Sequence, residues 1–210
     1  MEPTLLFPTN ASVDRINKKR LDRLKKSGNE SLTFQSKTSV ISKLNLSDKE
    51  KHFIITLLDK SCPADDTLEL VIGSQVMLIT NKDVEGGLVN GSRGVITSFI
   101  NGLPIVRFVN GIVMPVVQHT WDLIEEGRYH AFKVQIPLKI AFAMSIHKVQ
   151  GMSLDLVQMD LGSSIFEYGQ TYTALSRVRT LDGLYLIDFD PAKIKTNPKV
   201  IEFYTSRKNK

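Results

Sequence analysis

The chain has 210 residues, of which 42% are hydrophobic and 23% are charged, a composition that is ordinary for a globular protein. The net charge of +5 and the pI near 9.2 suit a polyanionic partner but do not identify one. The single cysteine, Cys62, excludes an internal disulfide framework and favours a reducing, intracellular setting. No apolar run approaches the roughly 18 residues of a membrane span, so no membrane partner is expected.

The first predicted elements are a short buried strand over residues 4–8 and a helix that continues to Lys26. Asn10 or Ser12 can cap this helix, and Gly28 follows its end. A strand that leads tightly into a helix is typical of an α/β fold.

The next stretch carries weaker signals. Residues 32–34 are expected to form a strand, 36–51 a loop, and 53–58 a helix that is broken at Pro63.

From Leu68 onward the pattern changes to short β-type runs separated by glycine-containing turns. Asn101-Gly102 and Asn110-Gly111 flank the run 103–109, and Asn-Gly between apolar runs is the strongest short-range hairpin signal. The region therefore predicts an antiparallel meander, interpreted as a small barrel inserted between α/β segments.

The α/β pattern returns near the end of the chain. Strands are expected over 140–143, 156–161 and 184–187, a polar loop over 145–150, and a helix over 168–178.

The polar loop carries the first set of residues that could bind a ligand. Ser145 and His147 can donate hydrogen bonds to phosphates, and Lys148 supplies a positive charge. Gly151 allows close backbone approach or a positive φ. Each residue taken alone has an ordinary structural explanation, as a surface histidine or a turn glycine.

The second set follows in the expected helix. Tyr172 and Leu175 are placed one turn apart on an apolar face, and Arg177 ends the helix. A guanidinium can grip two phosphate oxygens and stabilise charge that develops in phosphoryl transfer. The structural alternative is that Arg177 only complements the helix dipole.

Taken together, the strings over 146–155 and 169–177 closely resemble motifs V and VI of superfamily-one-B helicases. The nearest group is the petite-integration-frequency family, which is related to RecD. Further segments agree in order and extend the resemblance over nearly the whole chain, less clearly between 36 and 66. These segments are Pro8-Thr9-Asn10 with Val13, Ile16 and Asn17 (motif IV), residues 68–94, Gln135-Ile136-Pro137-Leu138, Phe189-Asp190-Pro191, and Asn197-Pro198.

The resemblance implies an α/β fold: a RecA-like second motor domain with an inserted, small, all-β Src-homology-three-like barrel. The expected boundaries are 1–84 and 134–205 for the two parts of the motor domain, 85–133 for the barrel, and 206–210 for a basic tail.

The resemblance also implies residue roles. Arg177 is the expected arginine finger, and Ser145 and His147, with Lys148 beside them, are expected to contact single-stranded DNA. The residues expected to face the nucleotide are Gln150, Gly151, Gln170 and Asn10. Two departures from the family pattern, Val149 for a serine and Lys37 for an acid, leave the finger untouched.

Two expected motifs are absent from the sequence. No Gly-x-x-x-x-Gly-Lys-Ser/Thr string occurs to cradle phosphates. No apolar strand ends in Asp-Glu to hold magnesium, because Glu125-Glu126 falls in the expected barrel. The resemblance implies that ATP and Mg²⁺ are bound mainly by a preceding RecA-like domain. No metal ligands are assigned here, and the fragment alone is predicted to be inactive as an ATPase.

The function implied for the intact protein is that of an ATP-dependent 5′-to-3′ DNA helicase acting on single-stranded and forked DNA in replication, repair or recombination. The alternative is a non-catalytic nucleic-acid-binding remnant of a helicase. A RecA-like ligand-binding protein unrelated to DNA is a third hypothesis. The sequence leaves the compartment within the cell open, with nucleus, mitochondrion or viral replication site as the alternatives.

Overall fold

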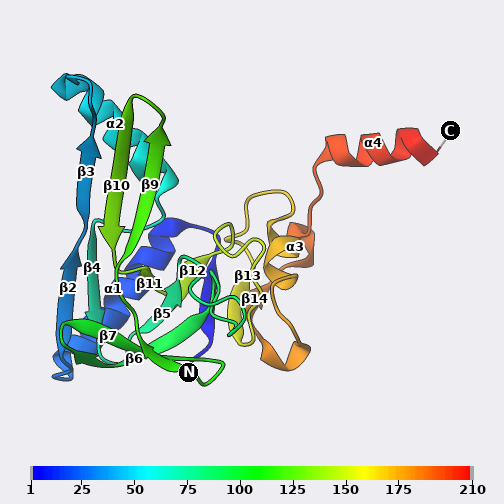
Figure 1. The fold of residues 1–210 in the computed structure, drawn as a ribbon. Coiled ribbons are helices and arrows are strands. Elements are labelled where there is room, and N and C mark those ends of the chain that lie inside the picture. The colour runs from blue at the N-terminus through cyan, green and yellow to red at the C-terminus, as the bar shows by residue number, and fades with distance from the viewer. Residues whose placement is uncertain (1, 209–210) are drawn as a thin grey trace. The chain divides into compact units, whose positions relative to one another are not determined.

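The computed structural model describes residues 2–208, without the side chain of Lys208 (Figure 1). The chain divides into two compact units, one formed by Met1–Arg20 with Ala141–Lys210 and the other by Leu21–Ile140. The second unit is thus an insertion in the sequence of the first. The barrel boundaries expected from the sequence, at 85 and 133, both fall inside this second unit.

The first unit contains a four-stranded, all-parallel sheet with the strand order β12-β1-β13-β14. Its strands are β1 (Thr4–Phe7), β12 (Ala143–Ser145), β13 (Val157–Leu161) and β14 (Leu184–Phe189). Parallel strands need crossover connections, and the whole second unit lies in the one between β1 and β12.

The expected strand over 140–143 was wrong. Residues 138–140 form β11 (Leu138–Ile140) in the second unit, and β12 begins only at Ala143. The apolar run is continuous in sequence, but its two ends belong to different sheets. Ser145, expected in the loop, is the last residue of β12 and is 2% exposed.

Helix α1 (Asn10–Lys26) begins in the first unit and ends in the second. The other helices of the first unit are α3 (Gln170–Leu175) and α4 (Pro198–Lys208), with short 3₁₀ turns η1 (Leu181–Gly183) and η2 (Pro191–Lys193). The hydroxyl at the start of α1 is that of Thr9, whose Oγ1 accepts a hydrogen bond from the Ser12 amide at 3.4 Å. The predicted caps were Asn10 and Ser12, one and three residues too late.

In the second unit, a five-stranded antiparallel sheet has the order β11-β5-β6-β7-β8. The strands besides β11 are β5 (Gln75–Leu78), β6 (Arg93–Ile100), β7 (Leu103–Phe108) and β8 (Val113–Pro115). The predicted meander is confirmed, since β5 to β8 pair in sequence order. Asn101 and Gly102 have φ of 51° and 74° at the β6–β7 turn, as a tight hairpin requires.

A two-stranded sheet of β2 (Ser31–Gln35) and β4 (Thr67–Val71) shares a hydrophobic core with the five-stranded sheet. The strand expected at 32–34 is confirmed. The core residues are Leu68, Leu70, Val76, Leu78, Leu88, Ile96, Val106, Phe108, Val116, Ile136 and Leu138.

The third sheet of this unit has the order β3-β10-β9 and packs against α2 (Asp48–Ser61). Its strands are β3 (Lys37–Ile41), β9 (His119–Glu125) and β10 (Tyr129–Gln135). The expected loop over 36–51 was therefore wrong. It holds β3 and the first turn of α2, where Ser47 and Glu50 form a capping box.

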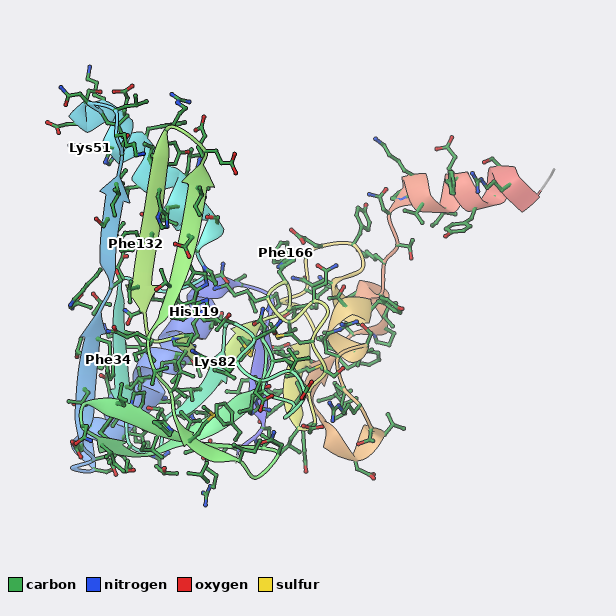
Figure 2. The ribbon with its side chains drawn as sticks, in the orientation of Figure 1. Phe34, Lys51, Lys82, His119, Phe132 and Phe166 are labelled. Carbon is green, nitrogen blue, oxygen red and sulfur yellow. The ribbon has the colours of Figure 1, made fainter. Side chains whose placement is uncertain are left out.

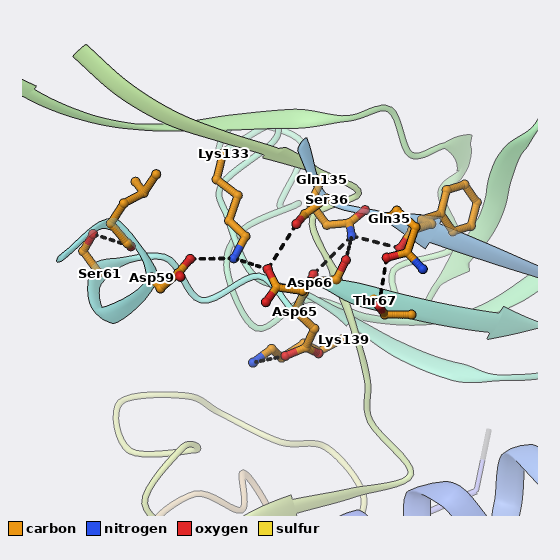
Figure 3. A network of polar contacts seen from close by, with 12 residues as sticks. Gln35, Ser36, Asp59, Ser61, Asp65, Asp66, Thr67, Lys133, Gln135 and Lys139 are labelled. Carbon is orange, nitrogen blue, oxygen red and sulfur yellow. Dashed lines mark hydrogen bonds and ion pairs between the residues drawn. The ribbon is translucent and has the colours of Figure 1, made fainter. Parts of the chain in front are cut away.

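A buried ammonium group ties α2 to β10 (Figure 3). The Lys133 side chain is 3% exposed, and its Nζ lies 2.8 Å from Asp59 and 2.6 Å from Asp66. Nearby, Gln135 donates to the Phe34 and Asp65 carbonyls, both at 3.1 Å. These contacts connect strands β2 and β10 with the segment that leads from α2 to β4.

The pKa directions within this network follow from its geometry. Burial lowers the pKa of Lys133 and is the largest single influence, but the hydrogen bonds to Asp59 and Asp66 together outweigh it, so the pKa is raised. The hydrogen bond from Lys133 is the main cause of the lowered pKa of Asp66. The stabilisation that Asp66 contributes is thus fully present above the pKa of this carboxyl group in the unfolded chain, and it is lost as pH falls through its pKa in the folded protein. The stabilisation that Lys133 contributes is lost only as pH rises through the raised pKa of Lys133.

Removing the two acids should cost more than removing the base. Asp59→Asn with Asp66→Asn leaves a buried ammonium uncompensated, which should reduce the free energy of unfolding by about 3 kcal/mol. Lys133→Met leaves carboxylates that are 44% and 75% exposed and stay hydrated, so the loss should be smaller. Urea unfolding at pH 7 measures both.

The same variants test the sign of the pH dependence. The wild type should lose more stability between pH 5 and pH 3 than Lys133→Met does, because the hydrogen bond from Lys133, which is the main cause of the lowered pKa of Asp66, is present only in the wild type. Lys25→Met, which removes the exposed ion pair with Glu69, is the control and should leave the midpoint nearly unchanged. Equal acid sensitivity of wild type and Lys133→Met would contradict this account.

Candidate functional site

The loop after β12 alternates buried apolar anchors with exposed polar groups. Ile146 and Val149 are fully buried, while His147, Lys148 and Gln150 are exposed. Successive main-chain hydrogen bonds close tight turns, from Lys148 N to Ser145 O and from Gln150 N to His147 O. The polar side chains are consequently presented outward from a fixed backbone.

Gly151 is explained by its backbone angle. Its φ is 83°, and an added Cβ would meet nothing within 4 Å. Of the two explanations offered by the sequence, the positive φ therefore accounts for this glycine within the chain.

The helix expected over 168–178 is much shorter than predicted. Gly169, with φ of 72°, precedes α3, which ends at Leu175, so Arg177 lies two residues beyond the helix. The expected apolar face was also wrong, because Tyr172 is 74% exposed. The buried face of α3 is formed by Gln170, Thr171 and Ala174.

Arg177 is half-buried and donates only to neutral acceptors. Its Nη1 lies 3.3 Å from Met152 O, its Nε 3.2 Å from Thr173 O, and its Nη2 2.8 Å from Ser176 Oγ. No carboxylate pairs with it anywhere in residues 2–208, whereas neighbouring Arg179 pairs with Asp155 at 3.0 Å. The positive charge of Arg177 is thus uncompensated.

Main-chain contacts hold the two sequence strings together. Leu154 N donates to Arg177 O at 2.8 Å, and Arg179 N donates to Leu154 O at 3.2 Å. Together with the contact to Met152, they place the Arg177 guanidinium next to the backbone that follows Gly151.

Gln170 has a different setting from the other expected nucleotide-facing residues. It is 3% exposed; its Oε1 accepts from the amides of Phe166 and Glu167, and its Nε2 donates to Pro8 O at 3.4 Å. Phe166, labelled in Figure 2, lies in the loop that precedes α3. Gln170 joins this loop to the end of β1, beside which Asn10 is exposed at the start of α1.

Two residues of this region were not assigned a role from the sequence. Asn17 lies in α1, and its side-chain amide accepts from Ala143 N at 2.9 Å and donates to Ala143 O at 3.1 Å. Glu167 Oε2 lies 2.7 Å from His147 Nε2. Both contacts join residues far apart in sequence, so no local pattern predicts them.

Part of the chain matches the family model described as the 2B domain of the DNA helicase Pif1, over residues 55–99. The ATP-dependent DNA helicase PIF1 of Xenopus laevis is 46% identical over 154 residues, which cover 72% of this chain and 24% of that protein. The crystal structure of Pif1 helicase from Candida albicans matches with a TM-score of 0.78 and 30% identity, covering 98% of this chain and 50% of the other. Pif1 helicase from Bacteroides in complex with ADP-AlF3 and ssDNA matches with a TM-score of 0.65 and 26% identity, covering 100% and 46%.

The fold is thus mixed α/β, with a parallel sheet and an antiparallel β domain that match part of the Pif1 structures. The chain belongs to the Pif1 family of ATP-dependent DNA helicases, as a region that includes the 2B domain and is homologous over most of its length. It spans about a quarter of the Xenopus relative and half of the Candida chain. No helix in the described part of the chain is long and apolar enough to cross a membrane.

The amide of Asn17 should be important for the stability of the first unit. β12 is an edge strand, and Asn17 satisfies the Ala143 N–H and C=O that face away from β1. Asn17→Ala should therefore lower the free energy of unfolding by about 1–3 kcal/mol, the cost of leaving buried polar groups unpaired. Lys18→Ala, at the exposed neighbouring position, should have little effect in the same thermal or urea melt. Equal effects of the two variants would contradict the role given to Asn17.

Proposed function

We propose that the intact protein is an ATP-dependent 5′-to-3′ DNA helicase and that this chain forms its second motor domain, a RecA-like domain with an inserted Src-homology-three-like barrel. The observation that carries the proposal is the uncompensated guanidinium of Arg177, held beside the backbone that follows Gly151. Likeness to a Pif1 structure described as a complex with ADP-AlF3 and ssDNA supports it.

On the nucleotide side, Arg177 acts as the arginine finger. A guanidinium that makes only neutral hydrogen bonds can exchange them for charged phosphate oxygens, which bind it more strongly. The exposed Gln150, Gly151 and Asn10 complete this side, and buried Gln170 holds the loops in place.

These residues fit one side of a nucleotide and not the whole of it. The chain supplies a cation and exposed polar groups but no Gly-x-x-x-x-Gly-Lys-Ser/Thr loop to surround the phosphates. ATP with Mg²⁺, held mainly by an upstream RecA-like domain, supplies the phosphoryl group whose hydrolysis drives the motor. The fragment alone is accordingly inactive as an ATPase.

On the DNA side, His147 and Lys148 contact the phosphates of single-stranded DNA. Both side chains are exposed on a loop whose apolar residues are buried, so they can approach a strand without rearranging the backbone. Ser145, which is 2% exposed, reaches the strand only if the intact protein opens access to it. Forked DNA is the proposed duplex substrate.

Arg177→Ala in the intact protein should reduce the kcat of DNA-stimulated ATP hydrolysis about 10³-fold or more, because the charge developing on the γ-phosphate loses its partner. Binding of single-stranded DNA without nucleotide should stay within about twofold. The matched control is Arg179→Ala, two residues away and paired with Asp155, which should retain turnover. Full turnover by Arg177→Ala would remove the finger assignment, whereas an intact protein without any DNA-stimulated turnover would favour the remnant hypothesis.

His147→Ala in the 210-residue chain should weaken binding of oligo-dT several-fold and flatten the salt dependence of the binding constant. Each phosphate contact with a single strand contributes about 0.7 to the logarithmic slope. Fluorescence anisotropy over a range of NaCl concentrations measures both quantities. His52→Ala, an exposed histidine of α2, is the control. An unchanged slope for His147→Ala would count against the phosphate contact.

A further inference from the structure

The histidine proposed to contact DNA already holds an internal anion. His147 Nε2 lies 2.7 Å from Glu167 Oε2, and the two side chains are 55% and 51% exposed. His147 follows β12, whereas Glu167 lies in the loop between β13 and α3. An ionised carboxylate can only accept hydrogen bonds, so Nε2 is the donor in this pair.

Hydrogen bonds to buried or main-chain acceptors fix the backbone around Glu167. Its amide donates to the buried Oε1 of Gln170 at 3.4 Å, and the Phe166 amide donates to the same oxygen at 3.2 Å. Gly169 N also donates to Lys195 O at 2.9 Å. Hydrogen bonds therefore fix the loop backbone at several nearby positions, which limits where the Glu167 carboxylate can lie.

A carboxylate oxygen and a phosphate oxygen are acceptors of the same kind. Nε2 carries a single hydrogen, so it can satisfy Glu167 or a DNA phosphate but not both. We propose that Glu167 is a built-in competitor for the DNA backbone, which occupies His147 when no strand is bound and is displaced when a phosphate arrives. This inference rests on the proposed function of His147.

The energetics suit an exchange of partners. A hydrogen bond between two side chains this exposed contributes little to stability, so a phosphate can displace Glu167 at low cost. Lys148, exposed beside His147, pairs with no carboxylate in residues 2–208 and offers the incoming phosphate a positive charge. The hydrogen bond from His147 to Glu167 has to break before Nε2 can bind a phosphate, which weakens binding of the strand. Such a competitor sets an upper limit on affinity, as a motor that must release and rebind DNA requires.

The test is a double-mutant cycle on the 210-residue chain with fluorescein-labelled oligo-dT at low salt. Glu167→Gln keeps the shape of the side chain but removes its charge, and it should tighten binding about two- to fivefold, the range that corresponds to an exposed ion pair. In the His147→Ala background the same substitution should give no gain. Glu202→Gln, an exposed acid of α4, is the control for general electrostatics, and thermal melting checks that each variant is folded.

Each outcome decides the proposal. Weaker binding by Glu167→Gln would show that Glu167 orients His147 for DNA, and an equal gain without His147 would reduce the effect to long-range repulsion. Either result contradicts the proposal that Glu167 competes with DNA, but it leaves the proposed contact between His147 and DNA unaffected. If His147→Ala alone leaves DNA binding unchanged, the proposed contact between His147 and DNA is contradicted. The proposal that Glu167 competes for His147 is then contradicted as well.

Discussion

Main-chain hydrogen bonds between Leu154 and the segment of Arg177 to Arg179 hold the two chemically important loops side by side. The Arg177 side chain reaches Met152 O only because this backbone bridge brings the end of one loop against the end of α3. Since the bridge uses no functional side chain, the groups at the surface remain free to bind ligands. Substitutions of those groups should accordingly alter binding or turnover without unfolding the domain.

The loop after β12 separates two kinds of chemistry. Its first half carries His147, which is paired with Glu167, and its second half carries Gly151, next to the backbone that receives Arg177. Buried Ile146, which precedes His147, and buried Val149, which lies between His147 and Gly151, anchor the loop. In the proposed function, a short segment with buried apolar residues therefore joins the residues that contact DNA to those that face the nucleotide.

Local signals in the sequence predicted much of the fold. The Asn-Gly pairs identified the hairpins around β7 because their backbone angles are a property of the residues themselves. The Ser47–Glu50 capping box is equally local, and its pattern would have located the start of α2 inside the expected loop. Helix α3 was overestimated because the periodicity of 168–178 does not reveal that Gly169 adopts a left-handed conformation.

Signals that depend on the tertiary structure were not available from the sequence. Continuous hydrophobicity from Ile140 to Ala143 cannot show that its two ends belong to different sheets. The pairings of Asn17 with Ala143 and of Glu167 with His147 span long stretches of chain and follow no spacing rule. The resemblance to helicase motifs identified the candidate residues, but only the structure shows which of them are in contact with one another.

In the proposed function, Arg177 serves a nucleotide held by another part of the intact protein. Its most direct test is a structure of that protein with ADP-aluminium fluoride and single-stranded DNA. We expect the Arg177 guanidinium to leave Met152 O and to lie within hydrogen-bonding distance, about 3 Å, of the fluoride that replaces the γ-phosphate. A guanidinium that stays on Met152 O, with the nucleotide fully bound, would contradict it.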